Sequence, residues 1–318
     1  MAVEKSHEGG GASATDRFRC GYVALAGRPN VGKSTLLNAL VGEHLSIVSA
    51  KAQTTRERVA GILSSDTFQI LFIDAPGLLE PRYALQEAMR GAAVAAMKEA
   101  DVVLFVGDAT RPSTLPGADF SRESDGRSSH VVVALNKVDL VDMVVRDALL
   151  EEIAGAGYRA LAISALTEEG LADLLELLLP LLPESPPLFP LDESATQPVR
   201  FFAQEYVREA CMDLFQEEVP YSITCRVDEF REDQNPIYIR VIIYVERESQ
   251  KGIVIGRGGS AIKKVGERSR QRIESLVGRR VFLELRAKVL PAWSRKYAQL
   301  KQLGFRTTPP GGGGQKAP

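Results

Sequence analysis

The chain has 318 residues, of which 45% are hydrophobic and 25% are charged, and its formal net charge is −2. That composition is typical of a soluble globular protein with a buried core, and the length suggests two domains. No stretch reaches the roughly 20 apolar residues of a membrane-spanning helix, and no signal peptide is visible. Three scattered cysteines are typical of buried thiols in a reducing cytosol. We therefore expect a cytoplasmic protein, with a peripheral association with the inner face of the membrane left open.

The charge is distributed unevenly along the chain. Residues 251–306 contain 15 Lys and Arg residues against 3 Asp and Glu residues, a local balance of +12, so the remainder carries −14. Such a split predicts a basic domain that meets an anionic partner.

Composition also divides the chain into two ordered blocks. Both ends are rich in small residues and are expected to be disordered. A Pro-rich stretch between the blocks predicts a semi-rigid linker. The predicted division is a tail at 1–17, a first domain at 18–182, the linker at 183–198, a second domain at 199–306 and a tail at 307–318.

The first block alternates apolar strands with helical segments. The strands are rich in Val, Leu, Ile and Phe, as expected of strands covered on both faces. This pattern predicts an α/β doubly wound sheet with ligand-binding loops at the C-terminal ends of the strands. The expected strands are 22–26, 69–74, 102–108, 131–136 and 160–164, and the expected helices are 33–41, 85–98, 141–154 and 171–179.

A Gly-rich loop between the first strand and the first helix matches the pattern G-x-x-x-x-G-K-[ST]. The glycines let backbone N–H groups wrap phosphates, Lys33 would reach the β- and γ-phosphates, and Ser34 would ligate Mg²⁺. The N-terminus of the helix adds its dipole, so the loop predicts a bound nucleotide. The expected nucleotide-binding residues here are Gly27, Arg28, Pro29, Asn30, Val31, Gly32, Lys33, Ser34 and Thr35.

A second motif follows the next buried strand and supplies a carboxylate. Asp74 is placed to hold Mg²⁺ through water, and the amide of Gly77 can contact a γ-phosphate. Ala75, Pro76 and Leu78 are expected to line the same loop. On its own, this Asp-x-x-Gly tetrad is a weak signal.

Two further motifs specify the base. Asn136, Lys137, Val138 and Asp139 follow a buried strand, and a carboxylate at Asp139 can accept both the N1–H and the N2–H₂ donors of guanine. Adenine offers no such pair of donors, so a site built on this pairing discriminates strongly. Ser164, Ala165 and Leu166 follow the last strand, where the Ala165 amide can contact guanine O6. In this order, the four motifs predict a guanine nucleotide, GTP or GDP, with Mg²⁺.

The four motifs together resemble those of the translation-factor-like class of P-loop GTPases. Residues 51–56 resemble the switch I segment of the Era, Der and tRNA-modification GTPases, which implies that Thr55, or alternatively Thr54, binds Mg²⁺ in the GTP state. Leu78 occupies the position of the Gln that orients the attacking water in Ras-like GTPases. We therefore expect slow intrinsic hydrolysis that needs another water-positioning group or a partner. The expected catalytic residues are Lys33, Thr55, Asp74 and Gly77.

Asn30 raises the question of a monovalent cation. In related GTPases with a Pro-Asn pair in the phosphate loop, this side chain can help to hold K⁺ near the phosphates. The alternative is a loop Asn that bonds to its own backbone.

The second block predicts an α+β sandwich with helices on one face. Its expected elements are a helix at 199–217, strands at 221–230 and 237–246, a Gly-rich turn at 256–259, a basic helix at 260–277, a strand at 281–289 and a helix at 291–303. Apolar residues alternate along the strand at 281–289, which assigns one face to the core. We expect Trp293 to be buried as an anchor of the last helix.

The Gly-rich turn resembles the V-I-G-x-x-G signature of a KH domain, and the order of elements resembles its type II form. In that module the G-x-x-G loop clamps about four nucleotides of a single strand. The alternative is an ordinary helix-initiating turn with a solvated basic face. Few aromatic residues are available for stacking, so base reading would depend on hydrogen bonds. The expected RNA-binding residues are Gly256, Arg257, Gly258, Gly259, Lys263 and Lys264.

A GTPase domain followed by one C-terminal type II KH domain resembles the Era family of bacterial ribosome-assembly GTPases. Residues 75–82, 219–222, 244–251 and 300–305 are similar to Era segments, and the resemblance covers residues 21–305. It implies binding of the 3′ end of 16S rRNA, coupled to the GTP state, during 16S rRNA processing and assembly of the small (30S) ribosomal subunit. Ala75 departs from the usual Thr, and loop 113–129 departs from the family pattern.

Three functions follow from these motifs. The first is a slow GTPase, expected to be a monomer, whose nucleotide cycle controls RNA binding. The second is a nucleotide-sensing RNA chaperone in which hydrolysis is incidental, an alternative that Leu78 keeps open. The third is a relative acting on transfer RNA, but the chain lacks the further accessory domains of the tRNA-modification GTPase.

Overall fold

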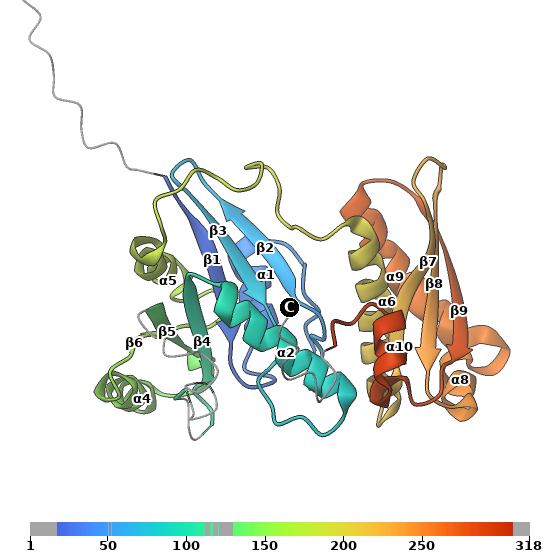
Figure 1. Cartoon of the computed structure of the whole chain (residues 1–318), viewed down its shortest axis with the longest axis horizontal. Coiled ribbons are helices and arrows are strands. Elements are labelled where there is room, and N and C mark those ends of the chain that lie inside the picture. Colours follow the sequence, from blue (N-terminus) through green and yellow to red (C-terminus); the bar gives the residue numbers. More distant parts are fainter. Residues whose placement is uncertain are drawn as a thin grey trace, which may run out of the picture.

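The computed structural model describes residues 18–49, 51, 53–111, 115–116, 120 and 130–307. The two predicted tails, except Thr307, and most of loop 113–129 lie outside these residues. Within the described part of the chain, the strands form one sheet of six strands and one of three (Figure 1). The predicted architecture, an α/β domain followed by an α+β domain, is confirmed.

The six-stranded sheet has the order β2-β3-β1-β4-β5-β6. Its parallel part contains β1 (Arg19–Ala26), β3 (Phe68–Asp74), β4 (Val102–Asp108), β5 (Val131–Asn136) and β6 (Arg159–Ala162), which match the five predicted strands. Because these strands run in one direction, their carboxyl ends meet at the same edge of the sheet, where loops bind ligands.

An edge strand, β2 (Val59–Ser64), pairs antiparallel with β3 and was not predicted. Its sequence contains Gly61, which weakens the strand signal. The structure explains this glycine, since a Cβ there would lie 2.8 Å from Val41 and 2.9 Å from Leu37 of the neighbouring helix. That helix therefore packs directly on the backbone of β2.

Helices cover both faces of this sheet. Leu37 of α1 (Lys33–Val41) and Leu174 of α5 (Leu171–Leu178) share one buried cluster with Leu25. Met97 of α2 (Ala84–Glu99) and Ile153 of α4 (Met143–Gly155) share another cluster with Ala24. Short 3-10 turns, η2 (Val138–Leu140) and η3 (Leu179–Leu181), also belong to this domain. Neighbouring residues of β1 thus enter opposite cores, as the period of a strand requires.

The second sheet has the order β7-β8-β9. β7 (Thr224–Arg231) pairs antiparallel with β8 (Ile237–Val245), and β8 pairs parallel with β9 (Val281–Val289). One face is covered by α6 (Val199–Leu214) and α9 (Ser260–Val277), whose apolar residues share the sheet's buried cluster. α8 (Glu248–Ile255) and η4 (Arg257–Gly259) lead into α9. The predicted strand at 221–230 begins later, at Thr224, because a short helix, α7 (Val219–Ser222), precedes it.

The C-terminal segment differs from the single helix that was expected. It forms η5 (Trp293–Arg295) and α10 (Tyr297–Gln302), separated at Lys296. Its apolar residues pack against Leu85 and Met89 of α2 rather than joining the helical layer of the second sheet. α10 therefore lies between α2 and the second sheet (Figure 1).

Burial of individual side chains agrees with the sequence analysis. Trp293 is fully buried, and its indole N–H donates to the carbonyl of Ser222 at 2.8 Å. Cys20, Cys211 and Cys225 are buried free thiols. Among the described residues, no helix has both the length and the apolar character needed to span a bilayer.

Candidate functional site

The phosphate loop connects β1 to α1 at the carboxyl edge of the six-stranded sheet. Gly27 and Gly32 have positive φ angles of 141° and 100°. A Cβ at Gly27 would lie 2.5 Å from the carbonyl oxygen of Val106, and one at Gly32 would lie 2.3 Å from Nδ2 of Asn136. Both positions therefore require glycine, and the loop is held close to the strands that carry the other motifs.

Two of the four catalytic residues expected from the sequence, Lys33 and Asp74, are buried in this edge. The Nζ atom of Lys33 donates to the carbonyls of Gly27 and Arg28 at 3.3 and 3.0 Å. Burial lowers the pKa of Lys33, an effect that Asp74 opposes, and burial raises the pKa of Asp74, an effect that Lys33 opposes. Each charged form gains from a counter-charge: a phosphate group suits Lys33, and a divalent cation suits Asp74.

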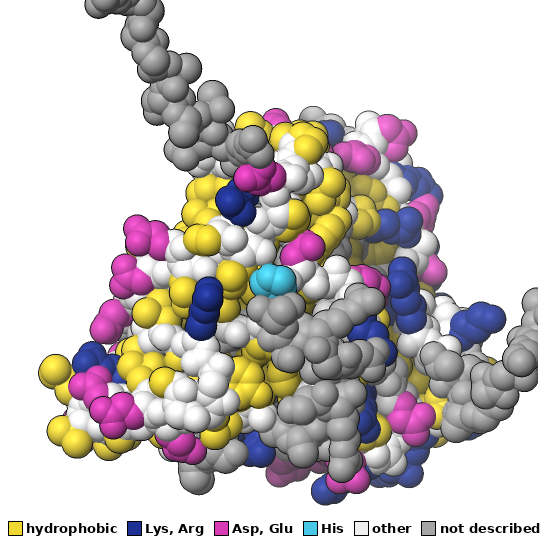
Figure 2. Space-filling view, turned by 60° about the vertical axis from the view of Figure 1, so that its left-hand side comes forward, with side chains coloured by type: hydrophobic (Ala, Val, Ile, Leu, Met, Phe, Trp, Pro, Cys, Tyr) yellow, Lys and Arg dark blue, Asp and Glu magenta, His cyan; other side chains and the backbone are white. Residues whose placement is uncertain are grey.

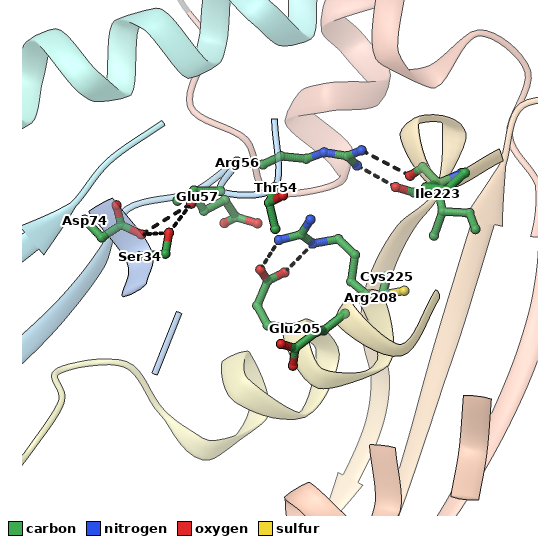
Figure 3. A network of polar contacts seen from close by, with 12 residues as sticks. Ser34, Thr54, Arg56, Glu57, Asp74, Glu205, Arg208, Ile223 and Cys225 are labelled. Atoms are coloured by element: carbon green, nitrogen blue, oxygen red, sulfur yellow. Dashed lines mark hydrogen bonds and ion pairs between the residues drawn. The ribbon is translucent and has the colours of Figure 1, made fainter. Parts of the chain in front are cut away.

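Three oxygen-bearing side chains expected to bind Mg²⁺ lie close together, and Figure 3 shows two of them, Ser34 and Asp74, in contact. The Ser34 hydroxyl donates to Oδ2 of Asp74 at 2.6 Å, and the Thr55 hydroxyl lies 2.9 Å from that of Ser34 and 3.3 Å from Oδ2 of Asp74. Thr54 instead donates to the carbonyl of Lys51 at 2.7 Å, so the geometry favours Thr55.

The chemistry of this oxygen cluster fits Mg²⁺. Mg²⁺ prefers oxygen ligands in an octahedron. The cluster brings two hydroxyls and a carboxylate within 3.3 Å of one another, so these residues would supply oxygens of the type that the ion takes. Oδ1 of Asp74 is buried and has no hydrogen-bond partner in the described part of the chain. Among the described residues no group of three His, Cys, Asp or Glu side chains offers a competing metal site.

Asn136 links the phosphate loop to the base-binding loops. Its amide donates to the carbonyl of Val31 at 2.8 Å, and its side-chain oxygen accepts from the amide N–H of Ala165 at 2.9 Å. Asn136 itself is 2% exposed. One side chain thus fixes the distance between the loop that wraps phosphates and the amide expected at guanine O6. Asp139 is exposed in η2 and Leu166 is exposed beside it, at the surface of the same edge.

Asp108, at the end of β4, belongs to this site and was missed in the sequence. Its carboxylate is 2.6 Å from Nζ of Lys137, which also donates to the carbonyl of Asn30 at 2.9 Å. The pKa of Asp108 is lowered overall: burial acts to raise it, but hydrogen bonds from Lys137 and Thr110 outweigh that effect. Asp108 is the last residue of a predicted buried strand, and that position was the available signal. It holds Lys137 over the phosphate loop.

A cavity of about 320 Å³ lies against these loops. Residues from the phosphate loop, from segment 47–55 and from Gly77 line it, together with Lys137. A Cβ at Gly77 would lie 2.6 Å from the backbone nitrogen of Pro29, so this loop closes directly on the phosphate loop. Leu78 does not line the cavity; its N–H donates to the carbonyl of Gly27 at 3.0 Å, and its side chain packs on the core.

The Gly-rich turn of the second domain stands apart from this edge. Gly256, Gly258 and Gly259 all have positive φ, and a Cβ at Gly256 would lie 2.7 Å from that of Ala261. Arg257 is exposed at the turn, and Lys263 and Lys264 lie on the first turn of α9. In Figure 2, dark-blue Lys and Arg side chains are more numerous toward the right-hand side of the view, where they are interspersed with Asp and Glu side chains.

A groove of about 360 Å³ runs from this basic helix to the edge strand β9. It is lined by Lys263 and Arg270 of α9 and by Phe282 and Leu285 of β9. Phe282 is 56% exposed and stacks on Tyr238 with ring centroids 5.8 Å apart. Sequence reasoning missed this aromatic pair because the two residues meet only through strand pairing.

Family models match both halves of the chain. A model described as 50S ribosome-binding GTPase matches residues 22–146, and a KH domain model matches residues 218–294.

Whole-chain relatives agree with this division. The chain is 42% identical to GTPase Era of Geotalea daltonii over 300 residues and 39% identical to GTPase Era of Carboxydothermus hydrogenoformans over 292 residues. Each match covers 91% of this chain and 98% of the relative.

Two solved structures have the same fold over most of their length. One is a single-residue variant of Aquifex aeolicus Era bound to GDP·AlF4⁻, and the other is Era in complex with MgGDPNP and nucleotides 1506–1542 of 16S ribosomal RNA. Each has a TM-score of 0.84 and 39% identity and covers 91% of this chain and 99% of its own.

Proposed function

This chain belongs to the Era family of GTPases, and we propose that its GTP cycle controls binding of the 3′ end of 16S rRNA during assembly of the small ribosomal subunit. Two features of one chain support this proposal. The motifs expected to bind a guanine nucleotide surround a cavity at the carboxyl edge of the six-stranded sheet, and a groove lies between the basic helix α9 and β9 behind the G-x-x-G turn. In the related complex, RNA and MgGDPNP are bound at the same time.

The proposed domains are a GTPase domain at 18–182 and a KH domain at 199–306, joined by the linker at 183–198. In the first, Lys33 binds the β- and γ-phosphates, and Asp139 selects guanine. Ser34, Thr55 and Asp74 would hold Mg²⁺, which when bound neutralises charge on the phosphates. Lys33 and the amide of Gly77 stabilise the charge that develops on the transferred phosphoryl oxygens.

Slow intrinsic hydrolysis follows from the position of Leu78. Its side chain is apolar and packs on the core, so it orients no water. Lys33 and the backbone amides then supply electrostatic stabilisation without a group that fixes the nucleophile. Fast hydrolysis therefore needs another group to position the attacking water, and we propose that bound RNA or the ribosomal particle supplies it or brings it into place.

In the second domain, Gly256 to Gly259 let the backbone approach a single strand, and Lys263 supplies counter-charge. The groove also presents Phe282, whose exposed ring gives a base a stacking surface. Stacking of this kind contributes about 1–3 kcal/mol per base. Base reading therefore has an aromatic component in addition to hydrogen bonds.

The test is single-turnover GTP hydrolysis with and without an oligonucleotide carrying the 3′ end of 16S rRNA. We expect stimulation by this RNA, weaker stimulation by a scrambled RNA, and tighter RNA binding with a GTP analogue than with GDP. A variant with Arg257 and Gly258 both changed to Asp should lose RNA binding and keep GTP binding. Unchanged hydrolysis together with equal RNA affinity in both nucleotide states would favour the alternative, an RNA chaperone in which hydrolysis is incidental.

We propose a monomer that acts in the cytoplasm, where the ribosomal subunit is assembled. A peripheral contact with the inner face of the membrane is a further proposal, to be tested by flotation with vesicles. Asn30 adds K⁺ as a proposed cofactor of hydrolysis.

A further inference from the structure

Lys51 and residues 53–57, which include the described part of the segment that resembles switch I, contact both domains. Thr55 turns its hydroxyl toward Ser34 and Asp74, at 2.9 and 3.3 Å. The next residue, Arg56, extends away from this oxygen cluster toward Ile223 of the second domain (Figure 3). Neighbouring residues of one loop thus serve two different domains.

Arg56 docks on the carboxyl end of the short helix α7. Its guanidinium donates to the carbonyl oxygens of Ile223, of Tyr221 at 3.0 Å and of Pro220 at 3.5 Å. The last carbonyls of a helix lack partners within the helix and favour a cation. Arg56 is only 4% exposed, so this contact is made away from water, where hydrogen bonds to a charged group are strongest.

Trp293 closes the same contact from the C-terminal segment. Its indole N–H donates to the carbonyl of Ser222, in the same turn, at 2.8 Å. The Cζ atom of Arg56 lies 5.6 Å from the centre of the Trp293 ring, within the range of a cation–π interaction. Arg56 is therefore enclosed by backbone carbonyls on one side and by an aromatic face on the other.

Two charged side chains on either side of Arg56 also bind this segment to the second domain. The Nζ atom of Lys51 donates to the carbonyls of Met212 and Phe215 at the end of α6, the latter at 2.6 Å. Glu57 forms an ion pair with Arg226 of β7 at 2.8 Å. The hydroxyl of Thr55 is the contact that this segment makes with the oxygen cluster of the first domain.

We propose that Arg56 is a positioning residue of GTP hydrolysis. By docking on the carbonyls of α7, it holds Thr55 against Ser34 and Asp74, so the second domain completes the Mg²⁺ site of the first. This inference rests on the proposed role of Thr55 as an Mg²⁺ ligand. Because coupling between two sites is reciprocal, Mg²⁺ and GTP in turn favour the docked position of Arg56.

The experiment compares Arg56→Met with the wild-type full-length chain in single-turnover hydrolysis at saturating GTP. A loss of about tenfold to a hundredfold is expected, the effect of a small displacement of a group in the site. The Mg²⁺ concentration at half-maximal rate should rise. GDP affinity without Mg²⁺ should stay within about twofold, because Arg56 binds carbonyls of the second domain and does not line the nucleotide cavity. Arg58→Met, which removes an ion pair with Glu99 at the surface, is the matched control and should hydrolyse GTP like the wild type.

Trp293 provides a second readout because it is the one tryptophan of the chain and lies under Arg56. Adding Mg²⁺ and a non-hydrolysable GTP analogue should change its fluorescence in the wild type and leave it unchanged in Arg56→Met. Arg56→Lys keeps the charge but loses the fork of donors, so it should rescue part of the rate. If Arg56→Met is unfolded by circular dichroism, Arg56→Lys carries the test, with the same direction of the Mg²⁺ shift expected.

Thr55→Ala separates this inference from the function on which it rests. If Thr55→Ala leaves the Mg²⁺ dependence unchanged, the proposed metal site is wrong. If Thr55→Ala shifts it and Arg56→Met does not, the metal site stands and the positioning role is refuted. The double variant should be no slower than Thr55→Ala alone, because Arg56 acts through Thr55. Fully additive losses would also overturn the proposal.

Discussion

Replacing Asn136 by Ala tests whether one buried amide holds the two halves of the nucleotide site together. The substitution removes hydrogen bonds of 2.8 Å to Val31 and 2.9 Å from Ala165, both buried. Each lost bond leaves a buried backbone group unpaired, at a cost of about 1–2 kcal/mol, or about 2–4 kcal/mol together. Since both groups lie on loops that meet the nucleotide, we expect most of this cost in binding, as a loss of about 30-fold to 1,000-fold in GDP affinity.

The assay is equilibrium titration with a fluorescent GDP analogue, with thermal unfolding measured in parallel. Asn136→Asp should bind no better than Asn136→Ala, because a carboxylate oxygen would then face the carbonyl of Val31. Asp142→Ala is the control: it removes the side chain that caps α4 through Val145 N–H at 2.9 Å and should lower stability by about 1 kcal/mol while GDP affinity is kept. If Asn136→Ala bound GDP within about threefold of the wild type, the bridging argument would be refuted.

Other predictions concern the base, the RNA groove and the cation. Asp139→Asn should weaken GTP binding and favour xanthine nucleotides, and a retained preference for GTP in competition assays would contradict the base assignment. RNA affinity should fall steeply between about 50 and 200 mM salt, since several phosphates are neutralised, whereas a flat profile in filter binding would rule out the basic groove. Phe282→Ala should reduce RNA affinity by about 1–3 kcal/mol without changing GTP binding, measured on the same preparation. Equal hydrolysis rates in potassium and sodium buffers would remove the proposed role of Asn30.

The nucleotide edge could be predicted from the sequence because its residues follow parallel strands. Gly27, Asp74, Asn136 and Ser164 each lie at the end of an apolar run, and the carboxyl ends of such strands meet at one edge. Their proximity was therefore implied by local patterns alone. Asp108 obeys the same rule, but a single carboxylate at the end of a strand has no recognisable motif around it.

Contacts between distant segments had no such local signal. Arg56 and Ile223 are separated by 167 positions, and nothing in their spacing indicates that they touch. Alternation along the strand at 281–289 assigned one face to the core, but the pairing of Phe282 with Tyr238 depends on the register of β8 and β9. The edge strand β2 was missed because the glycine in its centre weakens the local strand signal. The strand is stabilised by its pairing with β3, which the sequence of β2 alone does not indicate.

The cluster that joins α2 to the C-terminal segment also bears on the order of synthesis. Leu85 and Met89 are made about 200 residues before Trp293 and Phe305, the partners that bury them. Domains generally fold from the N-terminus as the chain emerges, so the GTPase fold forms first with this apolar face of α2 uncovered. A chain whose translation stops early would keep that face exposed to chaperones and proteases. Burial of the α2 face thus requires that synthesis has reached Phe305.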